Sequence, residues 1–225
     1  MRKQFILLLF LSGICSTAAA QVGWQIKTAI GASDFKGSPL MTTAFSYKAG
    51  IGADIPLLGN WALQPILYFT SKGSKADIYY GYEQIDKAEV THRLYYLELP
   101  LFAAYKFDLA PDALLSLKAG PYISYGLKGK ASLSDSNFDN KGYKFPGDLF
   151  KDGTDYHGMA QLDNKQIATP AYNHFDVGIG LGVELNIRHV LIGAEGSWGI
   201  TSFGKDFTGE DLRQAAGYLT VGYQF

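Results

Sequence analysis

The stretch FDVGIGLGVEL, from Phe175 to Leu185, contains three closely spaced glycines and could be mistaken for a nucleotide-binding loop. The dinucleotide fingerprint G-x-G-x-x-G requires a glycine where this chain has Val183, and no helical pattern follows. Every second residue from Phe175 is large and apolar, whereas the residues between them are glycine or charged. This period of two predicts one long β-strand with an apolar face and a face of small or charged residues.

Seven further segments show the same alternation, and each is long enough for a tilted strand to cross a bilayer. In the second segment, for example, Phe45 and Ile51 share the apolar face, whereas Lys48 and Asp54 lie on the other. No segment longer than one turn has a helical period. The sequence therefore predicts an all-β fold of eight strands, at approximately 22–32, 44–55, 61–71, 94–106, 114–127, 174–187, 189–200 and 216–225.

Residues 1–20 predict a secretory signal peptide, because two basic residues precede an apolar core and Ala18 to Ala20 offer a cleavage site. The only cysteine, Cys15, lies in this segment. A lipoprotein is the alternative, with the lipid on Cys15, but the bulky Ile14 stands where such signals need a small residue. The mature domain, 21–225, contains no apolar run long enough for a transmembrane helix.

The connections between the predicted strands alternate between short turns and long loops, and the longest loop spans about 128–173. All long loops fall on one side, as in antiparallel up-and-down transmembrane β-barrels of the bacterial outer membrane. A soluble, lipocalin-like barrel explains the alternation equally well. The closing GYLTVGYQF, with its terminal aromatic residue, favours the membrane barrel because it looks like the signal read by the outer-membrane assembly machinery.

The aromatic residues of the apolar faces sort by height in this topology, as expected for girdles at two lipid interfaces. A core of a soluble protein gives no reason for such sorting. The predicted lipid-interface aromatics near the short turns are Trp24, Trp61, Tyr105, Tyr223 and Phe225, and those near the long loops are Phe45, Tyr47, Phe69, Tyr95, Tyr125, Phe175 and Trp198.

Four stretches resemble the PorT-like outer-membrane β-barrel family of the Bacteroidetes: YYLELPLFAAYKF (95–107), KAGPYISYGLKGK (118–130), FDVGIGLGVEL and GYLTVGYQF. The resemblance covers nearly the whole mature chain, and the first two stretches are its more specific motifs. It implies an eight-stranded barrel in the outer membrane of a Gram-negative bacterium. It implies no single activity, and the secretion and gliding role of the name-giving member is not carried over.

The inward face of such a barrel carries nearly balanced charge. Eight strands leave an interior just wide enough for side chains to fill, and isolated buried charges are costly. We therefore expect ion pairs that plug the barrel, with a narrow channel for ions or small solutes as the alternative. The predicted lumen network is Lys27, Lys48, Asp54, Glu98, Lys106, Lys118, Asp176, Glu184 and Glu195.

No cofactor, metal site or enzyme activity is predicted. The one candidate for surface chemistry is His174 with Asp176, and no serine motif completes a triad. Low charged content, 18%, and a net charge of −1 argue against nucleic acid as a partner. The expected partners are outer-membrane lipid and lipopolysaccharide, the assembly machinery, and a protein or glycan bound by the 128–173 loop or by Ile78 to Tyr82. An accessory role in a secretion complex is a further alternative.

Overall fold

A computed structural model describes most of the predicted mature chain. It covers residues 22–37, 41–80, 86–135, 143–144, 147–151, 172–205 and 211–225. The predicted signal peptide and most of the predicted 128–173 loop lie outside these residues. Among the residues described, no helix is long and apolar enough to cross a membrane.

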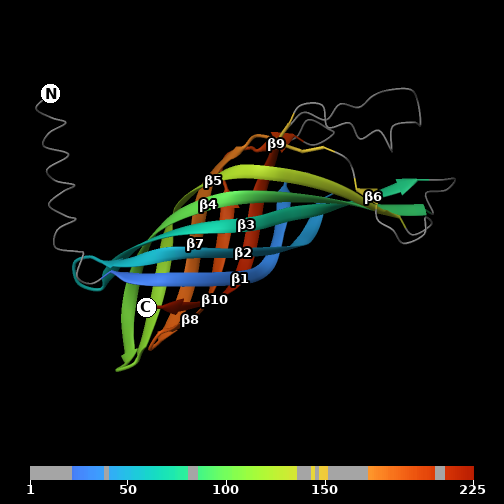
Figure 1. The fold of residues 1–225 in the computed structure, drawn as a ribbon. Helices are drawn as coiled ribbons and strands as arrows, with labels where there is room; N and C mark the ends of the chain where they lie inside the picture. The colour runs from blue at the N-terminus through green and yellow to red at the C-terminus, as the bar shows by residue number, and fades with distance from the viewer. Residues whose placement is uncertain are drawn as a thin grey trace, which may run out of the picture.

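Eight long antiparallel strands close into a ring, which confirms the predicted fold class (Figure 1). Each long strand pairs with the next along the chain, and the last pairs with the first through Gln25–Lys36 and Arg213–Gln224. The strands are β1 (Gly23–Lys36), β2 (Met41–Pro56), β3 (Trp61–Tyr80), β4 (Asp86–Ala110), β5 (Ala113–Asp135), β7 (Phe175–Ile187), β8 (Val190–Gly199) and β10 (Asp211–Gln224). Two-residue strands β6 (Tyr143–Lys144) and β9 (Gly204–Lys205) add to β5 and β10.

The short connections gather at one end of the barrel, near the C-terminus (Figure 1). They join β2 to β3, β4 to β5, and β7 to β8. Two of these turns use left-handed backbone, at Gly59 (φ 62°) and Arg188 (φ 59°). Glycine adopts this conformation without steric cost, whereas Arg188 is unusual there.

Strands β3, β4 and β5 are much longer than predicted, with 20, 25 and 23 residues. They continue past the barrel as a projecting sheet, and β6 adds to its β5 edge (Figure 1). Part of the predicted loop 128–173 is therefore strand up to Asp135, and the predicted loop before residue 94 is mostly β3 and β4. Alternation marks only the part of a strand that has apolar surroundings on one face, so it ends where both faces become polar.

Pro65, Pro100 and Pro121 lie within strands, where the missing N–H makes a β-bulge the expected accommodation, but the register does not shift at any of them. The register is unchanged from Pro65–Leu101 to Tyr68–Glu98, although the positions between have no partner across the ladder. Register shifts occur instead at Thr43/Tyr47, Tyr95/Tyr96 and Asp108/Ala110. Each proline thus removes a ladder hydrogen bond without inserting a residue.

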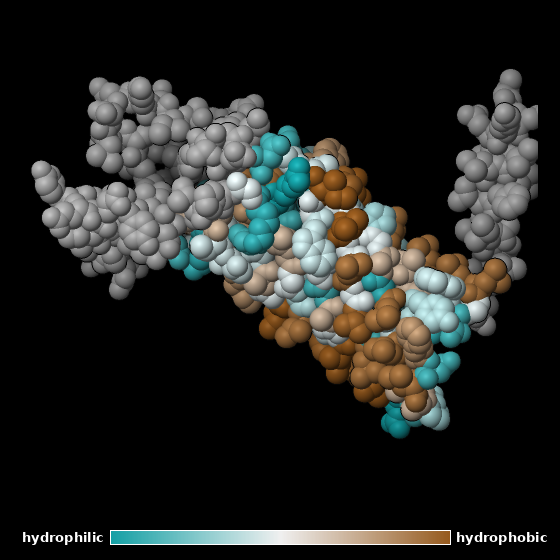
Figure 2. Space-filling view, turned by 180° about the vertical axis from the view of Figure 1, so that it is seen from behind, coloured by the Kyte–Doolittle hydropathy of each residue, from teal (hydrophilic) through white to brown (hydrophobic). Residues whose placement is uncertain are grey.

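The outer wall of the barrel is apolar, and its interior is polar. Large hydrophobic side chains such as Ile30, Ile51 and Leu219 are 60–69% exposed on the outside. Figure 2 shows hydrophobic residues spread over the wall, with hydrophilic residues at the tip of the short turns and toward the opposite end. This distribution matches an apolar band that faces lipid between two polar ends.

The barrel lumen and its outer cap

Five side chains from five different strands form a continuous chain of ion pairs across the lumen. Lys27 Nζ lies 2.6 Å from Glu184 Oε2, which also lies 3.0 Å from Lys118 Nζ. Lys118 Nζ lies 2.6 Å from Glu195 Oε1, and Lys48 Nζ lies 2.5 Å from Glu195 Oε2. All five side chains are at most 3% exposed. Lysines and glutamates therefore alternate along a path that crosses the lumen from β1 to β7 and β5 and returns through β8 to β2, the neighbour of β1.

Aromatic rings support this chain. Lys48 Nζ lies 4.3 Å from the ring centre of Tyr68 and 4.5 Å from that of Tyr218. Lys118 Nζ lies 5.3 Å from the ring centre of Phe102. A cation over an aromatic face is attracted by the negative charge of the ring's π system, and burial strengthens this attraction.

The three glycines of FDVGIGLGVEL lie beneath bulky lumen side chains. A methyl group at Gly178 would lie 2.5 Å from the Tyr122 ring, and one at Gly180 would lie 2.8 Å from the Phe102 ring. A methyl group at Gly182 would lie 2.8 Å from Cε of Lys118. These separations are too short for a real side chain, so β7 carries glycine at these three inward positions to make room for the groups that fill the lumen.

A second polar cluster lies closer to the end that carries the long connections. Lys72 Nζ lies 2.6 Å from Glu98 Oε2, and both side chains are at most 2% exposed. Asp176 accepts hydrogen bonds from the Tyr122 hydroxyl at 2.9 Å and from the Thr201 hydroxyl at 3.2 Å. At the short-turn end, Lys106 Nζ lies 2.5 Å from Asp54 Oδ2, with Lys106 22% exposed. Polar contacts thus extend along much of the lumen.

The structure brings eight of the nine predicted lumen residues into ion pairs, and the ninth, Asp176, into hydrogen bonds. Lys72 is not among the predicted lumen residues, because the predicted third strand ends at residue 71. Lys72 has the same even parity as the inward-facing Tyr68 and Thr70, so one more residue of strand would have placed it in the lumen. With Lys72, four buried lysines and the partly exposed Lys106 match five acids in number among the described residues of the lumen.

An apolar cluster of buried side chains, which we call the cap, lies at the outer end of the lumen. Three segments outside the long strands contribute to it, through Leu149 and Phe150, Tyr172, and Phe203. Their backbones are joined by hydrogen bonds from Tyr172 N to Leu149 O (2.8 Å) and from Asn173 N to Phe203 O (2.6 Å). The strands add Phe35, Leu94, Tyr96, Ala131 and Leu212.

A buried histidine lies at the margin of the cap. His92 packs edge-on against Tyr172 at its margin, with ring centres 6.4 Å apart. The site lies on β4 beyond the outer aromatic residue Tyr95, and burial lowers the pKa of His92 to about 4. A buried imidazole whose charged form is disfavoured in this way remains uncharged at neutral pH.

His174 belongs to the cap and does not contact Asp176. Its ring stacks on Phe150 (4.9 Å) and on Tyr125 (5.1 Å), and its Nδ1 lies 2.6 Å from the carbonyl oxygen of Gly126. Asp176 instead binds Tyr122 and Thr201. The predicted surface pair is therefore not assembled. In the described part of the chain, no group of three or more metal-binding side chains comes together.

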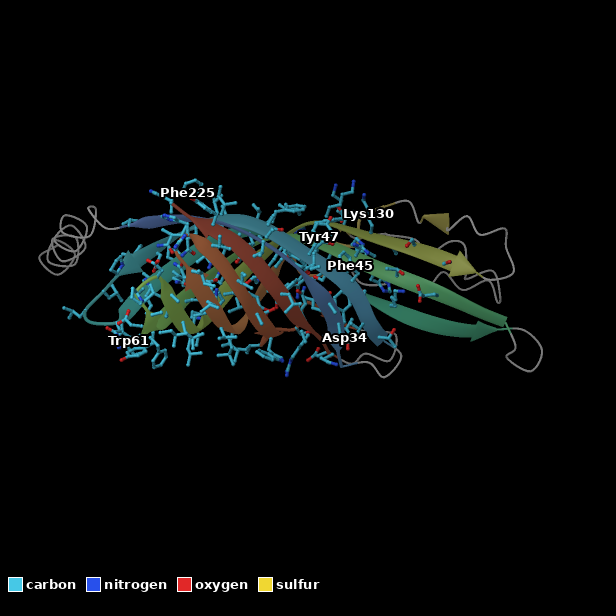
Figure 3. The ribbon with its side chains drawn as sticks, turned by 90° about the horizontal axis from the view of Figure 1, so that it is seen from below. Asp34, Phe45, Tyr47, Trp61, Lys130 and Phe225 are labelled. Carbon is cyan, nitrogen blue, oxygen red and sulfur yellow. The ribbon has the colours of Figure 1, made fainter. Side chains whose placement is uncertain are left out.

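The predicted interface aromatics all lie on the outer face. Nine are 42–67% exposed, and Tyr47, Tyr95 and Tyr105 are half-buried. They pair with neighbours at the same height, as Trp61 with Tyr105 (5.0 Å). Figure 3 shows Phe45 and Tyr47 nearer the end with β6, and Trp61 and Phe225 at the opposite end.

Several solved outer-membrane barrels have a similar arrangement. Neisserial surface protein A is 13% identical, with a TM-score of 0.43, over 91% of this chain and 99% of that one. The attachment invasion locus protein Ail of Yersinia pestis is 10% identical, with a TM-score of 0.40, over the same shares. The N-terminal barrel domain of Pseudomonas aeruginosa OprF is 13% identical, with a TM-score of 0.32, over 90% and 99%. No curated protein matches the chain.

The family comparison covers most of the sequence. Residues 17–204 match the family model described as outer membrane protein beta-barrel domain. This range includes every long strand except β10, which closes the ring against β1. The chain therefore belongs to the outer membrane protein beta-barrel domain family and is an integral protein of the outer membrane.

Proposed function

We propose that this protein is a closed barrel whose lumen is plugged by its own ion pairs, and that it acts through its external surface. The observation that carries the proposal is the ion-pair chain from Lys27 to Lys48, in which every charged group contacts an opposite charge at 2.5–3.0 Å inside the lumen. A conducting pore would need water and mobile counterions where these side chains lie. The cap adds an apolar layer above the polar chain.

The closed lumen predicts an absence of stable ion conduction. We expect planar bilayers that contain the purified wild-type barrel to show no resolved openings at moderate voltage, because ions would have to replace buried pairs and cross the cap. The measurement is single-channel conductance in a simple salt solution. A variant with both Lys118→Ala and Glu195→Ala should be compared after it has been shown to fold, by its mobility shift on heating.

Stable, ion-selective openings of the wild-type protein would contradict the plug and favour the alternative, a narrow channel. In that case Lys118→Ala or Glu98→Ala should change the conductance. Openings in the double variant alone would show that the ion pairs, rather than the cap, form the main barrier.

The external surface suited to recognition is the sheet formed by the outer parts of β3, β4 and β5. It extends beyond the outer aromatic residues, and its strands continue directly from the strands of the barrel (Figure 1). Of the predicted recognition segment Ile78 to Tyr82, residues 78–80 lie at its tip in β3, and residues 81–82 lie outside the described part of the chain. Exposed sheets and loops held by a rigid scaffold are common sites of protein and glycan binding.

Shortening this sheet tests its role in recognition. Ala76 and Val90 face each other across β3 and β4, so residues 77–89 can be replaced by a two-residue Asn-Gly turn without changing the register below. We expect the shortened barrel to lose at least about tenfold in binding to glycans or peptides that the wild type retains on an array. Equal binding by both proteins would place recognition outside this hairpin.

We also propose that the protein is related to the PorT-like family. A second candidate function is that of an accessory subunit of a secretion complex. A sheet that projects from the barrel suits a protein partner as well as a glycan. A stoichiometric partner that co-purifies with the wild type, and is lost with the shortened hairpin, would favour the accessory role.

A further inference from the structure

Three cationic side chains lie together on the outer wall between β4 and β5. Arg93 is directly opposite Lys130 in the strand pairing, and Lys128 is directly opposite Tyr95, two residues along β4. Lys128 and Lys130 are exposed, and Arg93 is half-buried. Opposite residues in an antiparallel pair have Cβ atoms about 5 Å apart, so the two like charges face each other closely.

A β-bulge turns the two lysines outward. The register shifts between Tyr95, which pairs with Lys128, and Tyr96, which pairs with Gly126, and this leaves Leu127 as an extra residue in β5. Below the bulge the odd-numbered residues such as Tyr125 face outward, and above it the even-numbered residues do. Without the extra residue, Lys128 and Lys130 would point inward, since one residue of shift moves every following side chain to the other face.

The cluster lies at the level of lipid headgroups. It follows directly on the outer aromatic residues, since Tyr95 stacks on Phe69 with ring centres 5.9 Å apart. Lys130 Nζ lies 5.7 Å from the centre of the Tyr95 ring, which draws the ammonium group toward the membrane. Figure 3 shows Lys130 toward the end with β6, on the far side of Phe45 and Tyr47 from Trp61. Interfacial aromatic rings themselves sit at the depth of the headgroups.

The charges of the cluster lack acidic partners within the described part of the chain. Two other cations at the outer end do have acidic partners: Lys36 Nζ lies 2.7 Å from Asp34 Oδ2, and Lys75 Nζ lies 3.0 Å from Glu89 Oε1. Like charges directly opposite each other destabilise a sheet unless an anion lies between them. An anionic ligand at this height would therefore offset the positive charge of Arg93, Lys128 and Lys130.

We propose that Arg93, Lys128 and Lys130 form a binding site for the phosphate groups of an outer-leaflet lipid headgroup. Arginine can hold a phosphate with two parallel hydrogen bonds, and the lysines add point charges beside it. The adjacent aromatic and aliphatic wall, including Tyr125 and Leu127, would contact the lipid chains below. The site goes beyond the closed barrel proposed above and depends only on the location in the outer membrane.

The test uses the full mature barrel in neutral detergent with phosphorylated lipid A as the probe. A triple variant, Arg93→Gln with Lys128→Gln and Lys130→Gln, is compared with the wild type by titration calorimetry. We expect the triple variant to bind roughly a hundredfold more weakly, because three basic contacts are lost. The matched control is Lys36→Gln, which removes a balanced charge at the outer end and should bind as the wild type does.

Two further ligands separate lipid phosphate from other sources of binding. Lipid A stripped of its phosphates should bind the wild type as weakly as the phosphorylated lipid binds the triple variant. Inorganic phosphate alone should show no saturable binding. The heat-dependent mobility shift first shows that the triple variant is folded. The proposal is overturned if this variant keeps wild-type affinity for the phosphorylated lipid. It is also overturned if the wild type binds the stripped lipid equally well or binds free phosphate as tightly as the lipid.

Discussion

Replacing Glu195 with glutamine is expected to lower the free energy of unfolding by about 3–5 kcal/mol, the usual cost of breaking a buried ion pair from one side. Glu195 lies 2.5 Å from Lys48 and 2.6 Å from Lys118, and both lysines are at most 3% exposed. Lys118 keeps its contact with Glu184, whereas Lys48 has no other acid within reach among the described residues. Urea titration in lipid vesicles, followed by the mobility shift on heating, measures the change.

The matched control is Glu89→Gln, which removes the same kind of contact from the partly exposed pair with Lys75. Such a pair contributes about 0–1 kcal/mol, because water screens it. A combined Lys48→Met and Glu195→Met variant should recover much of the loss, since it removes both charges of the pair. Similar losses for Glu195→Gln and Glu89→Gln would show that the lumen is hydrated and that its ion pairs do not form a plug.

Replacing Phe203 with alanine should cost the cap about 3–5 kcal/mol, as for other fully buried phenylalanines. The side chain is completely buried, with ring centres 4.8 Å from Phe35 and 5.2 Å from Tyr172. Its removal leaves a cavity where the cap segments meet β1. Hydrogen exchange of the backbone amides at Tyr172 and Asn173, which donate to Leu149 and Phe203, reports the opening of the cap directly.

A Phe203→Leu variant separates packing from the mere presence of an apolar group. Leucine fills part of the space and should cost well under half as much as alanine. If the alanine variant left exchange at Tyr172 unchanged, the cap would be held by its backbone hydrogen bonds and not by the aromatic cluster. If only these amides exchanged faster, with global stability unchanged, the cap would open as a local unit.

The sequence was sufficient to predict the ring of strands and the parity of each face. In β7, the alternation from Phe175 to Leu185 predicted both the strand and the inward position of Asp176 and Glu184. The strands of a membrane barrel are easier to predict than other strands, because lipid requires an apolar residue at every second position over the whole crossing. The ends of the strands cannot be predicted in this way, because the requirement for apolar residues no longer applies outside the lipid.

The partners within the lumen could not be predicted from the sequence. Parity places Lys27, Lys118 and Glu184 inside, but which lysine meets which glutamate depends on the stagger of strands that are not neighbours in the ring. The cap was missed for a different reason. Leu149, Phe150 and Phe203 are isolated apolar residues in predicted loops, and nothing in their local pattern shows that they fold back over the barrel mouth.

The ion chain across the lumen also has a consequence for the order of assembly. Lys27 and Glu184 are 157 residues apart in sequence, and Lys48 and Glu195 are 147 apart. Neighbouring strands can pair as hairpins from local contacts, but these two bridges form only after the sheet has curled far enough to bring its first and last strands together. Contacts of such long sequence separation form late in folding. We therefore expect the ion chain to lower the rate at which the closed barrel unfolds and to have little effect on the rate at which it folds.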